Sequence, residues 1–469
     1  MQKKKLVALL LVLGLLAPNC ISLSAENKTK NNIKPVHQLK GGVSDYKIEY
    51  INADWWDNFD DPILKSYVIK ALNANHGLKI ATLKVAEYQA LAREALGREF
   101  PVVGIGTNLS RQKTSDNVYM GKFHLSEYTQ NAYSFPLTAS YELDLWRKNR
   151  DRTLGALKEL EAARYDEKAV YISLISAVAT SYFNAIKMDK LIELQKDVIA
   201  LREKILELTK ERHDNGLCST AEVIRADKAL TEAKSGLNDL EKYRNTFLNQ
   251  LAVLTGQSVE NSLMLERASV DDLEPINNLP ASIKSEVVLQ RPDVLKAEAV
   301  LQKSRIDVKL ARKDFLPSIN ITGQFGFNSN IFDKALNWDS YAASMGLGIL
   351  ENIFTGGQRH ARLKARQMRY EQMLEAYKRS ILQAFQEVTD SLVAIKYDTQ
   401  KDNDNKSRLN FEKRNLELVN AKYEEGILSY LSTLEYKERE LMLQQDRIQS
   451  KIACFIDAIS LYKAVGGKL

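Results

Sequence analysis

Four stretches of the chain alternate apolar and polar residues one by one. The clearest is YSFPLTASYELDLW (133–146), in which every odd position up to 145 is apolar or aromatic and the even positions are mostly polar. A period of two predicts an extended strand with one apolar and one polar face. The same alternation occurs in three further stretches, at 101–109, 317–327 and 340–349.

Two long segments with helical periodicity follow the paired strands. No proline lies in 137–274 or in 318–469, and proline is costly inside helices. Within the first of these spans apolar residues recur every three or four positions, as on the buried face of a helix. We therefore expect helices of about 68 residues, or about 100 Å at 1.5 Å per residue, from Trp146 to Asp214 and from Gly357 to Glu425.

The two long segments belong to an internal repeat. Each ends in a turn-like sequence with one glycine, Gly216 in RHDNGLCST and Gly426 in KYEEGILSY. The segment FNAIK (183–187) recurs as LVAIK (392–396) at about the same offset, roughly 210 residues. Because the turns and the helical segments recur at the same spacing, an internal repeat explains them better than a chance likeness of two helical segments.

The prolines outside the helices support the same order of elements. Pro62 and Pro292 stand where proline is favoured, at the first position of a helix. Pro101 and Pro317 each end a helix and stand at the start of an alternating strand. The chain therefore predicts helix, strand, strand, long helix, turn and helix, and then the same order again.

The strand pattern fits a membrane better than a soluble sheet. Each strand has about the 9–11 residues that a tilted strand needs to cross a bilayer. A soluble β-sandwich needs a second sheet, and two strands per repeat between long helices provide none. In the second strand we expect five side chains to face lipid and the polar ones between them to face water. The five are Tyr133, Phe135, Leu137, Tyr141 and Leu143.

The number of strands predicts an oligomer. A membrane sheet must close on itself because no backbone edge stays unpaired in lipid, yet bacterial barrels begin at about eight strands. Two copies of this chain make a barrel filled by its own side chains, whereas three copies leave a passage. The predicted fold is a mixed α/β membrane protein, mostly α-helical, with two internal repeats and four strands per chain in a trimer-shared barrel of twelve.

The N-terminus has the features of an export signal. In MQKKKLVALLLVLGLLAPNC three lysines precede an unbroken apolar run, which is too short to span a bilayer as a stable helix. We expect residues 1–25 to be this signal, cleaved either before Cys20 or near Ser24 and Ala25. Cleavage before Cys20 is that of an acylated lipoprotein, but the preceding Ala-Pro-Asn departs from the small residues usual there. Both alternatives stay open.

Composition adds few constraints. The 469 residues are 45% hydrophobic and 27% charged, and the net charge of +6 is spread among nearly equal numbers of acidic residues. This pattern is typical of solvated helix faces, so no nucleic-acid partner is expected. Cys20, Cys218 and Cys454 form no disulfide framework. The five histidines have no metal-ligand spacing and no nucleotide-binding glycine loop occurs, so we expect no enzyme activity, cofactor or metal.

Seven motifs then identify a family. In chain order they are WWDNFDDPIL (55–64), YELDLW (141–146), QRPDVLKAEA (290–299), ARKDFLPSINITGQFG (311–326), ENIFTGGQRHARLKA (351–365), ILQAFQEVTDSL (381–392) and LYKAVGG (461–467). In this order they resemble the TolC-like outer-membrane efflux factors, in the NodT-type class that serves resistance-nodulation-division (RND) drug pumps. The resemblance covers essentially everything after the signal.

The resemblance implies an architecture and a function. The fold is then a homotrimer whose shared β-barrel in outer-membrane lipid continues as a long α-helical barrel into the periplasm. Two repeats, 26–255 and 291–469, are joined by an equatorial linker, 256–290. The implied function is a passive exit duct for drugs or other small molecules, working with a periplasmic adaptor and an inner-membrane RND transporter. Two alternatives remain: the exit duct of a type I protein secretion system, and a non-conducting rod that spaces the envelope layers.

The resemblance also assigns roles to the two glycine turns. They form the periplasmic tip, where the duct narrows to a gate and meets the adaptor. The implied adaptor contacts are Gly216, Leu217, Ser219, Gly426, Ile427 and Ser429, and the implied gate residues are Glu222, Glu435, Leu431 and Ser432, with Ser432 in place of a second acid. A local alternative is helix capping, with Ser219–Glu222 and Ser432–Glu435 as capping boxes and the glycines as helix C-caps. The two readings are compatible.

Overall fold

The structure is a computed structural model that describes residues 55–115, 117, 119–120, 123–124, 128–274, 279–280 and 282–467. All of these residues belong to one compact unit, Tyr50–Leu469. The expected export signal, 1–25, and Cys20 within it lie outside the described residues.

The internal repeat is confirmed by the helices. In the first repeat α3, α4 and α5 have 22, 67 and 35 residues, and in the second α7, α8 and α9 have the same lengths. The bounds are α3 (His76–Gly97), α4 (Lys148–Asp214), α5 (Thr220–Leu254), α7 (Pro292–Lys313), α8 (Gln358–Glu424) and α9 (Tyr430–Ala464). Both α8 and α9 begin and end 210 residues after α4 and α5.

One predicted helix is two helices in the structure. Pro62 opens a separate short helix, α2 (Pro62–Ala74), whereas Pro292 opens α7 directly. Asn75 separates α2 from α3 because its backbone is extended, and its side-chain oxygen then accepts a hydrogen bond from the Leu78 N–H as the N-cap of α3. The counterpart of α7 is therefore α3 and not the helix that begins at Pro62.

Short elements lie before the first repeat and between the two repeats. A 3-10 turn, η1 (Trp55–Phe59), precedes α2, and η2 (Val259–Met264), η3 (Val270–Asp272) and α6 (Ser285–Leu289) follow α5. These elements pack on the sides of long helices: η2 contacts α5, η3 contacts α4, and α6 contacts α8.

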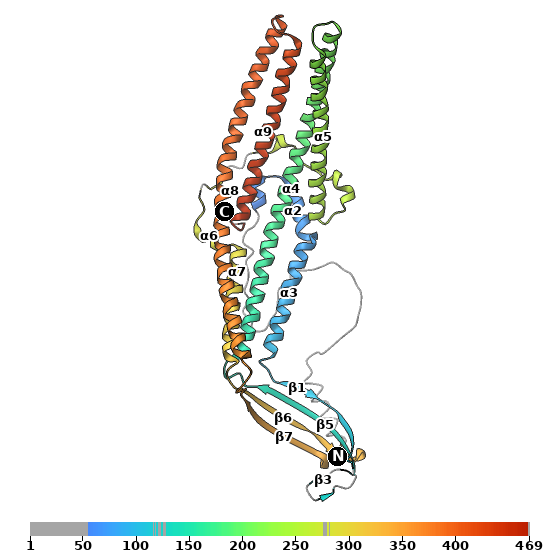
Figure 1. Cartoon of the computed structure of the whole chain (residues 1–469), viewed down its shortest axis with the longest axis vertical. Coiled ribbons are helices and arrows are strands. Elements are labelled where there is room, and N and C mark those ends of the chain that lie inside the picture. Colours follow the sequence, from blue (N-terminus) through green and yellow to red (C-terminus); the bar gives the residue numbers. More distant parts are fainter. Residues whose placement is uncertain are drawn as a thin grey trace. The chain divides into compact units, whose positions relative to one another are not determined.

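All four predicted strand stretches lie in one antiparallel sheet (Figure 1). Its strands are β1 (Val102–Ile105), β2 (Asn108–Lys113), β5 (Thr129–Glu142), β6 (Ser318–Ser329) and β7 (Tyr341–Leu350). β5 pairs with β1 and β2 along one edge and with β6 along the other, and β6 pairs with β7. Two further strands, β3 (Tyr119–Met120) and β4 (Phe123–His124), pair only with each other. The remaining helical turns, η4 (Phe332–Lys334) and η5 (Trp338–Ser340), connect β6 to β7.

The first predicted strand is interrupted opposite a proline. The pairing of β1 and β2 with β5 follows one continuous register, which places Gly106 opposite Pro136. Pro136 has no N–H to donate to a neighbouring strand, and its carbonyl accepts the Gly106 N–H at 2.9 Å. The ladder is therefore broken for two residues, and β1 and β2 act as a single strand with a gap.

Most of the apolar residues of the strands share one face of the sheet. In the observed register Leu137 lies opposite Ile105 on one side and Phe325 on the other, while its neighbour Thr138 lies opposite Gly104 and Gln324. This apolar face is open in the single chain, where Ile105 is 80% exposed. The predicted two-faced sheet is therefore present, and its apolar side is open along β1, β2 and β7.

The hydrophobic core surrounds the middle of α4. Phe183 of α4 packs on Phe455 of α9, with ring centroids 5.0 Å apart, and Trp55 stacks on Tyr462 at 5.0 Å. The N-terminal WWDNF motif thus docks on helices that are far away in the sequence. Among the described residues α4 contains one window apolar enough to cross a membrane, but 67% of that window is buried inside the protein, as expected for a core helix.

Candidate functional site

The two predicted glycine turns have the same backbone geometry. Gly216 and Gly426 have φ angles of 70° and 75°, the left-handed region that glycine adopts at low cost. The next residue in each turn closes back on the long helix, with Leu217 N to Arg212 O and Ile427 N to Lys422 O both at 2.8 Å. Both helices therefore end in the Schellman arrangement.

The turns present apolar side chains to solvent. Leu217 and Ile427 are 68% and 65% exposed, and both turns lie at the end of the helices opposite the sheet (Figure 1). Ser219 and Ser429 follow as the N-cap residues of α5 and α9. The six residues predicted to contact a partner thus lie in two equivalent, accessible turns.

The capping interpretation is only partly right. Ser429 is the N-cap of α9, and its hydroxyl accepts the Ser432 N–H at 3.2 Å, so the predicted Ser432–Glu435 capping box is wrong. Ser432 is instead the third residue of that helix. Ser219 is the N-cap of α5 as expected, but its hydroxyl donates to Glu222 Oε1 at 3.4 Å and caps no backbone N–H.

The two predicted gate glutamates, Glu222 and Glu435, are not at equivalent positions of the two repeats. With a spacing of 210 residues the counterpart of Glu222 is Ser432, and the counterpart of Glu435 is Arg225. Glu222 and Glu435 are both exposed, but they lie one helical turn apart in depth from the tip. Leu431 and Ser432 are half-buried.

The two helical hairpins are joined near the tip by polar contacts. Arg202 Nε on α4 lies 2.7 Å from Glu438 Oε1 on α9, and both side chains are mostly buried. One layer further from the tip, Gln445 Nε2 donates to Gln195 Oε1 at 3.0 Å. Any movement that separates the hairpins has to break these contacts.

The sheet places four of the five predicted lipid-facing residues together. Tyr133, Phe135, Leu137 and Tyr141 lie at alternate positions of β5. Leu143 follows the strand end, because β5 ends at Glu142, although the Leu143 N–H still bonds Ile319 O at 2.8 Å.

Sequence reasoning missed an aromatic cluster at the far end of the sheet. Phe332 and Trp338, in the connection between β6 and β7, pack on the apolar face against Tyr133 and Phe327, at 5.4 and 5.8 Å between ring centroids. Aromatic girdles of this kind mark the interface of membrane barrels. The sequence does show two aromatic residues close to a strand end. They lie in a loop, however, and a loop has no apolar–polar alternation that would show which face they cover.

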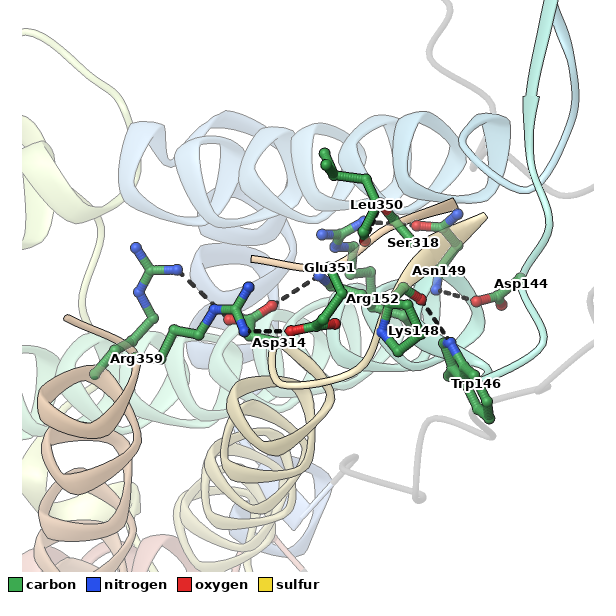
Figure 2. Close-up of polar contacts among 12 residues, drawn as sticks. Asp144, Trp146, Lys148, Asn149, Arg152, Asp314, Ser318, Leu350, Glu351 and Arg359 are labelled. Carbon is green, nitrogen blue, oxygen red and sulfur yellow. Dashed lines mark hydrogen bonds and ion pairs between the residues drawn. The ribbon is translucent and has the colours of Figure 1, made fainter. Parts of the chain in front are cut away.

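The near end of the sheet is held to the helices by a polar junction (Figure 2). Trp146 Nε1 donates to Pro317 O at 2.7 Å, which joins the segment that follows β5 to the residue before β6. Lys148 Nζ lies 2.7 Å from Asp314 Oδ1. Burial alone raises the pKa of Asp314, but the hydrogen bond and charge of Lys148 outweigh it and hold that pKa below its usual value. Asp314 is therefore a carboxylate at neutral pH and can pair with Lys148.

Metal chemistry has no candidate in the described part of the chain, where no group of three or more acidic, histidine or cysteine side chains comes together. Cys218 and Cys454 are both free thiols.

Comparison with known proteins decides the family. The sequence profile of the family described as outer membrane efflux protein matches residues 68–257 and 284–467. This chain belongs to that family. The two matched segments correspond to the two structural repeats, α3–α5 with β1–β5 and α7–α9 with β6 and β7.

The sequences of individual relatives align with this chain along most of their length. The chain is 28% identical over 420 residues to the pyoverdine export outer membrane protein OpmQ of Pseudomonas aeruginosa, covering 88% of this chain and 87% of that protein. It is 26% identical to the toluene efflux pump outer membrane protein TtgF of Pseudomonas putida, covering 88% and 85%.

Solved structures share the fold. The Campylobacter jejuni CmeC outer membrane channel superposes with a TM-score of 0.81 at 24% identity, covering 96% of this chain and 94% of that one. The open state of the Neisseria gonorrhoeae MtrE outer membrane channel superposes with a TM-score of 0.75 at 25% identity, covering 86% and 89%.

Proposed function

We propose that this efflux protein is the outer-membrane exit duct of a tripartite efflux pump. The observation that carries the proposal is the sheet: one continuous apolar face, with β1 and β2 at one unpaired edge and β7 at the other. Unpaired backbone groups in lipid cost several kcal/mol each. Counting β1 and β2 as one interrupted strand, each chain contributes four strands. Three copies joined edge to edge pair the backbone groups of both edges and close a barrel of twelve strands with its polar face inward.

The helices continue the passage beyond the membrane. In each chain α3, α4, α7 and α8 run from the sheet, and the hairpins α4–α5 and α8–α9 run on to the two glycine turns (Figure 1). Three such sets arranged around the barrel axis form a tube of helices. A tube of this kind transfers no energy, so an RND transporter in the inner membrane has to supply it through a periplasmic adaptor.

The tip is the proposed contact with the adaptor. Leu217 and Ile427 are exposed apolar side chains in matching turns, and the fully buried core of a protein–protein contact is more apolar than its rim. The residues around them, Gly216, Ser219, Gly426 and Ser429, are included in the same proposed surface. Glu222, Glu435, Leu431 and Ser432 are proposed to line the gate just behind it.

The substrates are proposed to be small molecules. The names of relatives mention pyoverdine export and toluene efflux, so the family accommodates chemically unlike cargo. We further propose that residues 1–25 are removed on export, with Cys20 as a candidate lipid anchor. Residues 26–255 and 291–469 are proposed as the two repeats, with 256–290 as their linker.

Reconstitution in planar bilayers tests the proposal. The purified protein is expected to give single-channel currents that divalent cations block at the tip, and Glu222→Ala with Glu435→Ala is expected to weaken that block. Asp404→Asn removes an exposed carboxylate of α8 and serves as the matched control. A protein that inserts and passes no current contradicts the duct and supports a spacer rod.

A further inference from the structure

Four helices form a curved row between the sheet and the core. α3 contacts α4, α4 contacts α7, and α7 contacts α8. A cavity of about 410 Å³ is nevertheless lined by residues from all four helices, including the outer members α3 and α8. Residues of the two outer helices can line the same cavity only if the row of four helices curves around it. The side of the row that contains the cavity is therefore its concave face.

The concave face is rich in positive charge. Its cationic side chains are Lys84, Lys158, Lys296, Lys303, Arg366 and Arg369, and its carboxylates are Glu159, Asp166 and Asp307. Each helix contributes residues three or four positions apart, which lie on one face of that helix. Six cations against three anions leave an excess of three positive charges per chain in this cavity.

The carboxylates lie deeper than most of the cations. Asp307 contacts Lys303 at 3.0 Å and Arg366 at 3.5 Å; its side chain is 16% exposed, whereas that of Arg366 is 49% exposed. Asp166 likewise contacts Lys296 at 2.6 Å and Lys84 at 3.4 Å. Each of these acids is shared by two cations, so the outermost groups of the wall are positive.

Two cations differ in how they are paired. Lys158 bonds Glu161, outside the cavity lining, at 2.7 Å. Within the described residues Arg369 contacts no carboxylate, and its Nη1 donates to Gln372 Oε1 at 3.2 Å. The charge of Arg369 is therefore not neutralised locally, and it is the most direct position at which to change the wall.

We propose that this face is a cationic collar that attracts anionic solutes into the duct and makes its current anion-selective. The inference rests on the proposed function, because the concave face lines the lumen only when three chains close around it. Three copies then place three such cavities around the duct, each lined by six cations and three carboxylates. Walls of one charge sign raise the local concentration of oppositely charged solutes, and the effect is strongest at low salt, where screening is weak.

The test is the reversal potential of the reconstituted channel in a potassium chloride gradient. The unmodified protein is expected to pass chloride in preference to potassium. Arg369→Glu reverses the charge at three positions of the collar, and it is expected to lower the chloride-to-potassium permeability ratio by about twofold or more. Lys364→Glu makes the same charge change on the same helix, about 140° around its axis from Arg369, and it is expected to leave the ratio unchanged.

The outcomes separate the collar from the duct. Two results would contradict the collar but not the exit duct. One is a channel that conducts and prefers potassium, and the other is a chloride-to-potassium permeability ratio that changes equally with Arg369→Glu and Lys364→Glu. A protein that gives no current in any of the three forms contradicts the duct, and the collar falls with it.

Discussion

Gly326 lies directly opposite Pro136 in the β5–β6 ladder. A Cβ atom at position 326 would come within 2.3 Å of the Phe135 carbonyl oxygen and 2.8 Å of Pro136 Cα. Gly106 lies opposite the same proline on its other side. Proline inside a central strand is rare because it breaks the ladder, and here a glycine on each side accommodates it.

Replacing Gly326 is expected to disrupt the sheet. Gly326→Ala forces the backbones of β5 and β6 apart, and overpacking of this kind costs about 1–3 kcal/mol or more. Gly323→Ala is the control, since nothing lies within 4 Å of a Cβ at that position of the same strand. The measurement is the yield of folded protein in the outer membrane. Equal yields for the two variants would show that the close approach has no consequence.

The proposed lipid and water faces can be tested with two neighbouring residues. Met345 lies on the apolar face and is 86% exposed, whereas Ser344 pairs with Gln324 on the polar face. A lysine facing lipid near the bilayer midplane costs about 2–4 kcal/mol, so Met345→Lys is expected to reduce membrane assembly while Ser344→Lys is tolerated. If Ser344→Lys is the damaging change, the faces are assigned the wrong way round.

The docking of the N-terminal segment depends on a buried hydroxyl. Tyr182 on α4 donates a 2.7 Å hydrogen bond to Asp61 Oδ2, and its hydroxyl oxygen accepts the Ala268 N–H at 3.2 Å. Tyr182→Phe leaves the buried Asp61 carboxylate and the half-buried Ala268 N–H each short of a partner, so it is expected to lower the free energy of unfolding by about 1–3 kcal/mol. Thermal unfolding in detergent measures this loss, and Tyr243→Phe, at an exposed position of α5, is the control. A melting temperature lowered equally by both changes would remove the special role of Tyr182.

Stability is expected to depend on pH through a pair of acids between α8 and α9. Burial, followed by the neighbouring Asp398 carboxylate, raises the pKa of Asp457 to about 7. The folded protein then holds a proton that the unfolded chain releases above about pH 4, so stability falls as pH rises from about 4 to about 7 and levels off above that. The group therefore destabilises the fold at alkaline pH.

Asp457→Asn removes that titration. The variant is expected to melt a few degrees higher than the unmodified protein at pH 8, with no comparable gain at pH 4. Asp404→Asn, at an exposed carboxylate of the same hairpin, controls for the loss of one negative charge. A gain that is the same at both pH values would mean that the Asp457 proton is not the cause.

Much of this fold is encoded locally, and those parts were predicted. The alternation in 133–146 requires only that one side of a strand be apolar, and a left-handed turn at Gly216 requires only a residue without Cβ. The lengths of α4 and α8 follow from the absence of proline together with the single glycine turn that ends each helix, at Gly216 and Gly426.

The features that were missed depend on contacts between distant residues. The gap between β1 and β2 follows from their register against Pro136, which no local pattern reveals. The stacking of Trp55 on Tyr462 joins the two ends of the described chain. The collar brings Lys84 and Arg366 into the lining of one cavity, although they lie on α3 and α8, and each of its charges by itself is an ordinary residue on the face of a helix.

The most direct test of the account is the mass of the detergent-extracted protein by native mass spectrometry. Because the sheet of each chain has two unpaired edges, we expect the protein to be extracted from the outer membrane as a trimer. Gly326→Ala is expected to reduce the amount of that trimer. A folded, membrane-extracted protein with the mass of a single chain would contradict the shared barrel and the duct that depends on it.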